Sequence, residues 1–137
     1  MRSVGANSNR GIQMRNLTMF IVLTAAVALL PATALGKGDP GVIKRGKCSN
    51  GAAWKLKAKN DDALIEVEFE VDQNVNGRRW NVVLKRNGTT VFRGVRVTRA
   101  PSGSFSVNRR IRGTARADRI TAVATTSGGR CQAALAV

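Results

Sequence analysis

Hydrophobic and polar residues alternate with a period of two from Cys48 to the end of the chain. This period is typical of β-strands that have one buried and one exposed face. Turn-forming residues interrupt the alternation often enough to define seven or eight short strands, and no segment after Lys37 has the period of a helix. The pattern predicts an all-β fold, an immunoglobulin-like antiparallel β-sandwich.

The clearest hairpin spans residues 54–72, with the sequence WKLKAKNDDALIEVEFEVD. Its first arm alternates apolar residues with lysines, and its second arm alternates apolar residues with carboxylates. A turn centred on Asp61-Asp62 places Leu56 opposite Val67 and satisfies both faces of the hairpin. The same register predicts the pairs Trp54–Phe69, Ala58–Ile65, Lys57–Glu66 and Lys55–Glu68.

A second hairpin is expected over residues 78–99, because Asn87-Gly88 is a strong signal for a two-residue turn. Its return arm breaks strict alternation, which a β-bulge near Gly94 would explain. That bulge would bury Phe92, Val95 and Val97 and leave Arg93 and Arg96 facing outward.

Three further strands complete the predicted sandwich. A turn at Pro101-Ser102-Gly103 precedes a strand with Phe105 and Val107 and then a basic stretch at 109–112. The other two strands cover residues 120–126 and 131–137, separated by a glycine-containing turn. Trp80, on the third long strand, suits an immunoglobulin-like topology.

Cys48 and Cys131 are the only cysteines, and an even number in an exported chain favours a disulfide. The bond would join the beginning of the domain to its end, although the spacing differs from that of antibody domains. The alternative is a reactive thiol, which would lack a histidine to activate it.

The N-terminal part of the chain has the layout of a secretory signal peptide. Arg15 precedes the apolar run 19–30, and small residues follow it. The run is shorter than the roughly 20 residues of a membrane-spanning helix. We therefore predict a signal peptide over residues 1–36 and a single secreted domain over 37–137, with no transmembrane segment in the mature chain. Met14 is an alternative start, and cleavage is expected after Ala34 or Gly36.

The charge balance narrows the expected partners. The chain has 23 basic and 8 acidic residues, and because three arginines precede Lys37, the predicted mature domain has a net charge of +12. This surplus favours an anionic partner such as a cell-wall polymer, although it also keeps a secreted protein soluble. The chain has no histidine and no tyrosine, which excludes histidine-based catalysis and the common zinc sites. We expect no metal and no cofactor.

Three polar motifs have both a chemical and a structural interpretation. The carboxylates of the first hairpin would suit a small hydrolase, but neighbouring lysines lower carboxyl pKa values, which disfavours a general acid. Residues 60–62 offer too few oxygen ligands for calcium and are better explained as a turn. Residues 87–89 match a glycosylation sequon but are again explained by a hairpin. The carboxylates of the first hairpin that would serve a hydrolase are Glu66, Glu68, Glu70 and Asp72.

The arginines between residues 93 and 119 are the strongest candidates for binding. The planar guanidinium group of arginine suits bidentate contacts with phosphate or carboxylate. The few aromatic residues all fit the core, so base stacking and specific nucleic-acid recognition are not expected. The predicted anion-binding set is Arg93, Arg96, Arg109, Arg110 and Arg112.

Three segments, WKLKAKNDDALIEVEFEVDQNVNGRRW, FRGVRVTRAPSGSF and ADRITAVAT, resemble a group of small exported proteins of high-GC Gram-positive bacteria. The resemblance implies secretion and a β-sandwich, and it supplies no site residues. We therefore expect a secreted, non-catalytic binding module, free or associated with the cell envelope, whose partner is an anionic wall polymer or another protein. The alternatives are a small secreted hydrolase and a purely structural or inhibitory protein.

Overall fold

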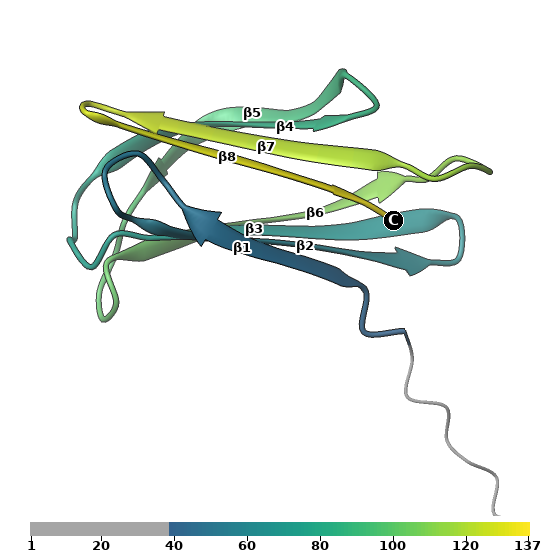
Figure 1. The fold of residues 1–137 in the computed structure, drawn as a ribbon, viewed down its shortest axis with the longest axis horizontal. Helices are drawn as coiled ribbons and strands as arrows, with labels where there is room; N and C mark the ends of the chain where they lie inside the picture. The colour runs from purple at the N-terminus through teal and green to yellow at the C-terminus, as the bar shows by residue number, and fades with distance from the viewer. Residues whose placement is uncertain (1–38) are drawn as a thin grey trace, which may run out of the picture. The chain divides into compact units, whose positions relative to one another are not determined.

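The computed structural model describes residues 39–137, which form eight antiparallel strands in two four-stranded sheets (Figure 1). The predicted signal peptide, with its start and cleavage sites, lies outside the described residues. No helix among them is long and apolar enough to cross a membrane. The strands are β1 (Val42–Lys47), β2 (Ala53–Asp61), β3 (Leu64–Asp72), β4 (Arg79–Arg86), β5 (Thr89–Val97), β6 (Ser104–Arg112), β7 (Arg119–Thr126) and β8 (Gly129–Ala136).

The strand order confirms the immunoglobulin-like sandwich. One sheet has the order β1-β2-β3-β6 and the other β5-β4-β7-β8. The chain therefore crosses between sheets after β3, after β5 and after β6, so that β2, β3 and β6 take the places of strands A, B and E of an immunoglobulin domain. Strands β5, β4, β7 and β8 take the places of C′, C, F and G. Strand β1, which precedes the alternating region of the sequence, is an additional strand beside β2.

The core lies between the two sheets and contains three of the aromatic residues predicted for it, whereas Trp54 and Phe92 are only partly buried. Trp80 on β4 and Phe69 on β3 are fully buried, and the Trp80 ring lies 6.1 Å from that of Phe105 on β6. The indole nitrogen of Trp80 donates a hydrogen bond to the Gln73 side chain at 3.2 Å, so the buried ring keeps its polar atom satisfied. Trp54 is only partly buried and packs at the margin of the core.

The first hairpin has the predicted faces but a different register. Asp61 pairs with Leu64, so the turn consists of Asp62 and Ala63 rather than being centred on Asp61-Asp62. Asp62 adopts a left-handed conformation with φ of 55°, which aspartate tolerates better than most residues. The pairing is displaced by two residues, an even number, so the same side chains remain buried. The pairs that form are Trp54–Val71, Lys55–Glu70, Leu56–Phe69, Lys57–Glu68, Ala58–Val67 and Lys59–Glu66.

The second hairpin turns at the predicted Asn87-Gly88, but its bulge is elsewhere. Both turn residues have positive φ, 48° and 83°, as a two-residue turn of this type requires. The register shifts between Leu84, which pairs with Phe92, and the next pair, so Val91 is the additional residue. The prediction of a bulge near Gly94 is therefore wrong. Arg96 consequently lies on the same side of β5 as Phe92, and Val95 is exposed.

The predicted disulfide is present. Cys48 lies in the connection between β1 and β2, and it is bonded to Cys131 on β8, 83 residues away in the sequence. Since β2 and β8 belong to different sheets, the bond joins the two sheets near one of their edges. No free cysteine remains among the described residues, and the reactive-thiol alternative is excluded in this structure.

Candidate functional site

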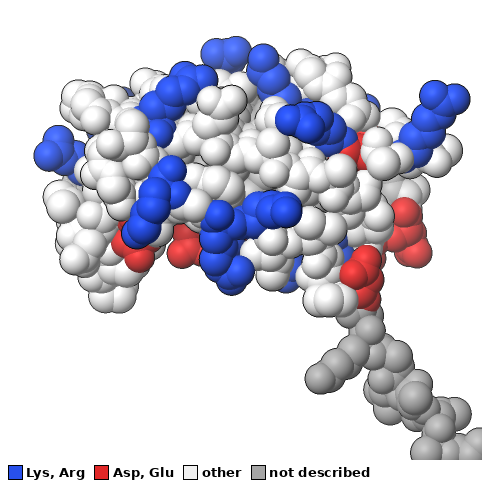
Figure 2. Space-filling model, in the orientation of Figure 1, with Lys and Arg blue, Asp and Glu red and all other residues white. Residues whose placement is uncertain are grey.

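The outward faces of the two sheets differ sharply in charge. Successive side chains of a strand point to opposite faces of its sheet. The side chains that alternate with the buried ones therefore point outward. We call the outward side chains of the β1-β2-β3-β6 sheet the mixed face and those of the β5-β4-β7-β8 sheet the basic face. In the view of Figure 2, most of the acidic side chains lie over the lower sheet, and basic side chains spread over both.

The mixed face contains five of the eight acidic residues of the chain, arranged beside basic residues. The register of the sheet places the carboxylates of β3 between the lysines of β2 and the arginines of β6. Seven basic and five acidic side chains share the face, so their charges largely cancel. They are Arg45, Lys47, Lys55, Lys57, Lys59, Arg110 and Arg112, against Asp61, Glu66, Glu68, Glu70 and Asp72.

Ion pairs on the mixed face account for Glu66, Glu68 and Glu70, three of the four carboxylates that sequence reasoning considered for catalysis. The fourth, Asp72, accepts a hydrogen bond from the Asn74 backbone. The Lys55 ammonium lies 2.9 Å from Glu68 and 2.8 Å from Glu70. Hydrogen bonds to Glu70 and then to Glu68 raise the pKa of Lys55 above its ordinary value. Arg110 contacts both Asp61 and Glu66. These contacts provide a structural explanation for the carboxylates that needs no reaction.

The basic face has five basic side chains and no acidic one. They come from all four strands of the sheet, and each except Arg93 lies next to a buried residue of its strand. None of the five forms an ion pair within the described part of the chain. The five residues are Arg79, Lys85, Arg93, Arg119 and Arg130, and all are exposed.

Neutral side chains fill the area between these charges. In one row across the sheet, Asn81 pairs with Thr125 on β7, and in the next row Val83 pairs with Val123, which pairs in turn with Gln132. Thr121 pairs with Lys85 in a third row, so hydroxyl and amide groups lie among short apolar groups. Because Arg79 and Lys85 are six residues apart on β4, the basic residues on that strand are separated by about 20 Å. The face thus offers hydrogen-bond donors within a basic perimeter.

The five arginines predicted as one site do not lie on one face. Arg93 belongs to the basic face, whereas Arg110 is paired with carboxylates on the mixed face. Arg112 ends β6, and its carbonyl oxygen accepts a hydrogen bond from Arg86. Arg96 and Arg109 lie together at the edge of the sandwich, against the ring of Phe92.

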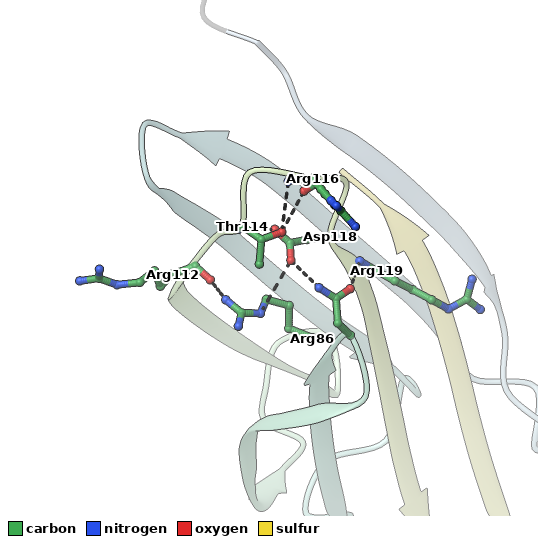
Figure 3. Close-up of polar contacts among 7 residues, drawn as sticks. Arg86, Arg112, Thr114, Arg116, Asp118 and Arg119 are labelled. Carbon is green, nitrogen blue, oxygen red and sulfur yellow. Dashed lines mark hydrogen bonds and ion pairs between the residues drawn. The ribbon is translucent and has the colours of Figure 1, made fainter.

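A buried polar cluster around Asp118 shows that some arginines near the predicted site have structural roles (Figure 3). Asp118 is 2% exposed and accepts hydrogen bonds from the Thr114 backbone and the Asn87 side chain, both at 2.7 Å. The guanidinium of Arg86 lies 3.7 Å from the Asp118 carboxylate. Figure 3 shows the side chains of Arg112 and Arg119 pointing away from this cluster.

The electrostatics of the Asp118 cluster favour the charged carboxylate. Burial raises the pKa of Asp118, but the hydrogen bonds from Thr114 and Asn87 and the charge of Arg86 outweigh burial and lower it below its ordinary value. The side-chain nitrogen of Asn87 donates a hydrogen bond to Asp118, and Asn87 and Gly88 both have the positive φ of a two-residue turn. The structure therefore supports the interpretation of residues 87–89 as a turn.

The predicted anion-binding set contains one of the five residues of the basic face, Arg93, and Arg119 lies in the arginine-rich stretch but outside that set. The alternation of buried and outward residues along each strand could have identified the other residues of the basic face. Arg79 and Lys85 are outward positions of β4, Arg119 is an outward position of β7, and Arg130 is one of β8. Their assembly into one face depends on the order of the strands, which the alternating pattern does not specify.

Comparison of the chain with protein-family models, with curated proteins and with solved structures found no match. The resemblance to small exported proteins therefore stays a prediction, and any function has to be argued from the residues of this chain.

Proposed function

We propose that the protein is a secreted, non-catalytic binding module that attaches to an anionic polymer through its basic face. The observation that carries the proposal is the segregation of charge between the two sheets. One face has five basic and no acidic side chains, whereas the other compensates its own charges. A basic surface that only kept the protein soluble would not require this separation.

The chemistry of the basic face favours a polymer recognised by its charge. The outward positions of β4, β5, β7 and β8 include no aromatic side chain, so neither bases nor sugar rings have a surface on which to stack. Arginine and lysine contact phosphate or carboxylate groups, and threonine, asparagine and glutamine add hydrogen bonds. We infer a teichoic-type phosphate polymer or an acidic polysaccharide as the ligand class, and no sequence-specific nucleic acid.

Export supports an envelope ligand. The disulfide between Cys48 and Cys131 is compatible with an oxidising compartment outside the cytoplasm. The signal-peptide layout of the first 36 residues is the second argument. N-terminal sequencing of protein recovered from the medium should begin after Ala34 or Gly36, and retention of the apolar run would contradict secretion as a soluble protein.

A salt titration tests the binding itself. The protein is titrated with teichoic acid, with DNA and with a neutral polysaccharide at several salt concentrations. Binding to both phosphate polymers should weaken steeply with salt, with a log–log slope of about 0.9 per phosphate neutralised on duplex DNA. The neutral polysaccharide should not bind. Equal binding to the neutral polymer, or no binding to any polyanion near physiological salt, would contradict the proposal.

A further inference from the structure

The edge of the sandwich between β5 and β6 holds a cluster of two arginines and one aromatic ring. The guanidinium carbon of Arg96 lies 4.8 Å from the centre of the Phe92 ring, and that of Arg109 lies 4.4 Å from it. Arg96 comes from β5 and Arg109 from β6, the edge strands of different sheets. We call these three residues the edge cluster.

The backbone of β5 sets up the edge cluster. The bulge at Val91 places Phe92, Gly94 and Arg96 on the side of the strand that faces the other sheet. A Cβ atom at position 94 would lie 2.9 Å from the Phe92 ring, so the glycine lets the ring lie along the strand. The ring then presents its π system to the two guanidinium groups, which is a favourable arrangement for cations.

Glu68 lines surface hollows together with both Arg96 and Arg109 among the described residues, but no carboxylate is paired with either guanidinium. Neither Arg96 nor Arg109 forms an ion pair there. Arg96 donates one hydrogen bond to the Val95 carbonyl at 2.9 Å, and Arg109 donates one to the Asn108 carbonyl at 3.3 Å. A guanidinium has five N–H donors, so most donors of both groups have no acceptor in this part of the protein.

Stacking on an aromatic ring fixes a guanidinium while leaving its in-plane N–H groups free to donate. Two such groups at one ring repel each other, and an anion that bridges them removes the repulsion and accepts their hydrogen bonds. We propose that the edge cluster is a binding site for a single tetrahedral oxyanion, a phosphate or sulfate group, held between Arg96 and Arg109. This site is separate from the basic face and does not depend on polymer binding there.

Protection of the sheet edges is the competing explanation for these arginines. Charged side chains on edge strands, including those that point inward, prevent pairing with other chains. That role requires only charge and predicts no preference between oxyanions and chloride. The selectivity for the anion therefore distinguishes the two explanations.

A nuclear magnetic resonance titration tests the proposal directly. Isotopically labelled protein is titrated with inorganic phosphate, with sulfate and with chloride at matched ionic strength, and the arginine Nε–H signals are followed. The signals of Arg96 and Arg109 should shift in a saturable way with phosphate and sulfate, and chloride should leave them nearly unchanged. Arg96→Gln and Arg109→Gln should each weaken phosphate binding by roughly tenfold or more.

Three further variants make the result specific to the cluster. Arg45→Gln is the matched control, because Arg45 lies on β1, at the opposite edge of the sheet from β6, and belongs to neither the edge cluster nor the basic face, so this variant should bind phosphate like the parent. Phe92→Leu keeps an apolar side chain but removes the ring. The double variant Arg96→Lys/Arg109→Lys keeps the two charges but removes the planar guanidinium groups. Both variants should weaken phosphate binding. An equal response to phosphate and chloride, or unchanged phosphate binding in the two Gln variants, would overturn the proposal whether or not the basic face binds a polymer.

Discussion

The side-chain amide of Asn87 donates a hydrogen bond to the carboxylate of Asp118 at 2.7 Å, across 31 residues of sequence. The backbone of Asp118 in turn exchanges hydrogen bonds of 2.9 Å and 3.0 Å with Val137. The side-chain amide oxygen of Asn87 accepts a further hydrogen bond from the Arg119 backbone N–H. One buried aspartate therefore connects the β4–β5 turn, the approach to β7 and the end of β8.

The stability of the protein should depend on pH through Asp118. Its folded pKa is lowered, so its contribution is fully present above the unfolded value of about 3.9 and is lost as the pH falls through the folded pKa. Asp118→Asn should cost about 1–3 kcal/mol at neutral pH, because the charge-assisted hydrogen bonds are lost. Urea unfolding between pH 2 and pH 7 measures both effects.

Asp62→Asn provides the control for the Asp118 substitution. Asp62 is exposed in the β2–β3 turn at φ of 55°, a conformation that asparagine also adopts. The same chemical change there should alter stability by less than about 0.5 kcal/mol. Equal effects of the two substitutions would mean that the Asp118 cluster does not stabilise the fold.

Loss of the disulfide should destabilise the protein strongly. The bond joins residues separated by 83 positions, and on the chain-entropy model a loop of this length contributes about 4–5 kcal/mol. Replacing Cys48 and Cys131 together by alanine should lower the free energy of unfolding by about 2–5 kcal/mol. Denaturant unfolding with and without a reductant gives the measurement. The reductant should destabilise the parent and leave the double variant unchanged, and a parent insensitive to full reduction would contradict this account.

Truncations should separate the buried faces of the two sheets from the outward mixed face. Phe69→Ala and Trp80→Ala remove fully buried rings, and each should cost about 3–5 kcal/mol. Glu68→Ala removes one partner of a partly exposed ion pair and should cost under about 1 kcal/mol. Thermal or chemical unfolding gives the ranking. A larger loss for Glu68 than for Phe69 would mean that the two faces had been assigned the wrong way round.

The alternating pattern was sufficient to predict which side chains of the first hairpin are buried, but not which residues pair. Three consecutive turn-formers, Asn60-Asp61-Asp62, allow turns at more than one position, and a displacement by two residues buries the same side chains. The ability of Asp62 to adopt positive φ selects the turn, and the sequence pattern does not reveal this preference.

The arginines were harder to place, because β5 is an edge strand with a bulge. Moving the bulge from Gly94 to Val91 exchanges the two sides of the strand, so Arg96 joins Phe92 and Val95 becomes exposed. With the bulge at either position, apolar residues lie on both sides of β5, so the pattern of apolar residues does not decide between Gly94 and Val91. The basic face was missed for a different reason: its residues come from four strands, and only the strand order brings them onto one surface.

We expect the position of the basic residues, and not their number, to determine polymer binding. Two triple variants with the same net charge test this expectation. One replaces Arg79, Lys85 and Arg119 on the basic face by glutamine, and the other replaces Arg45, Lys47 and Lys57 on the mixed face by glutamine. None of the six forms an ion pair within residues 39–137, so both variants should keep a thermal stability within about 1 kcal/mol of the parent.

The most direct measurement is the affinity of the two triple variants for teichoic acid at one fixed salt concentration. The basic-face variant should lose most of the binding and about three units of the log–log salt slope, one for each contact removed. The mixed-face variant should bind nearly as tightly as the parent. Equal losses in the two variants would show that net charge alone attracts the polymer, and would contradict a binding site on the β5-β4-β7-β8 sheet.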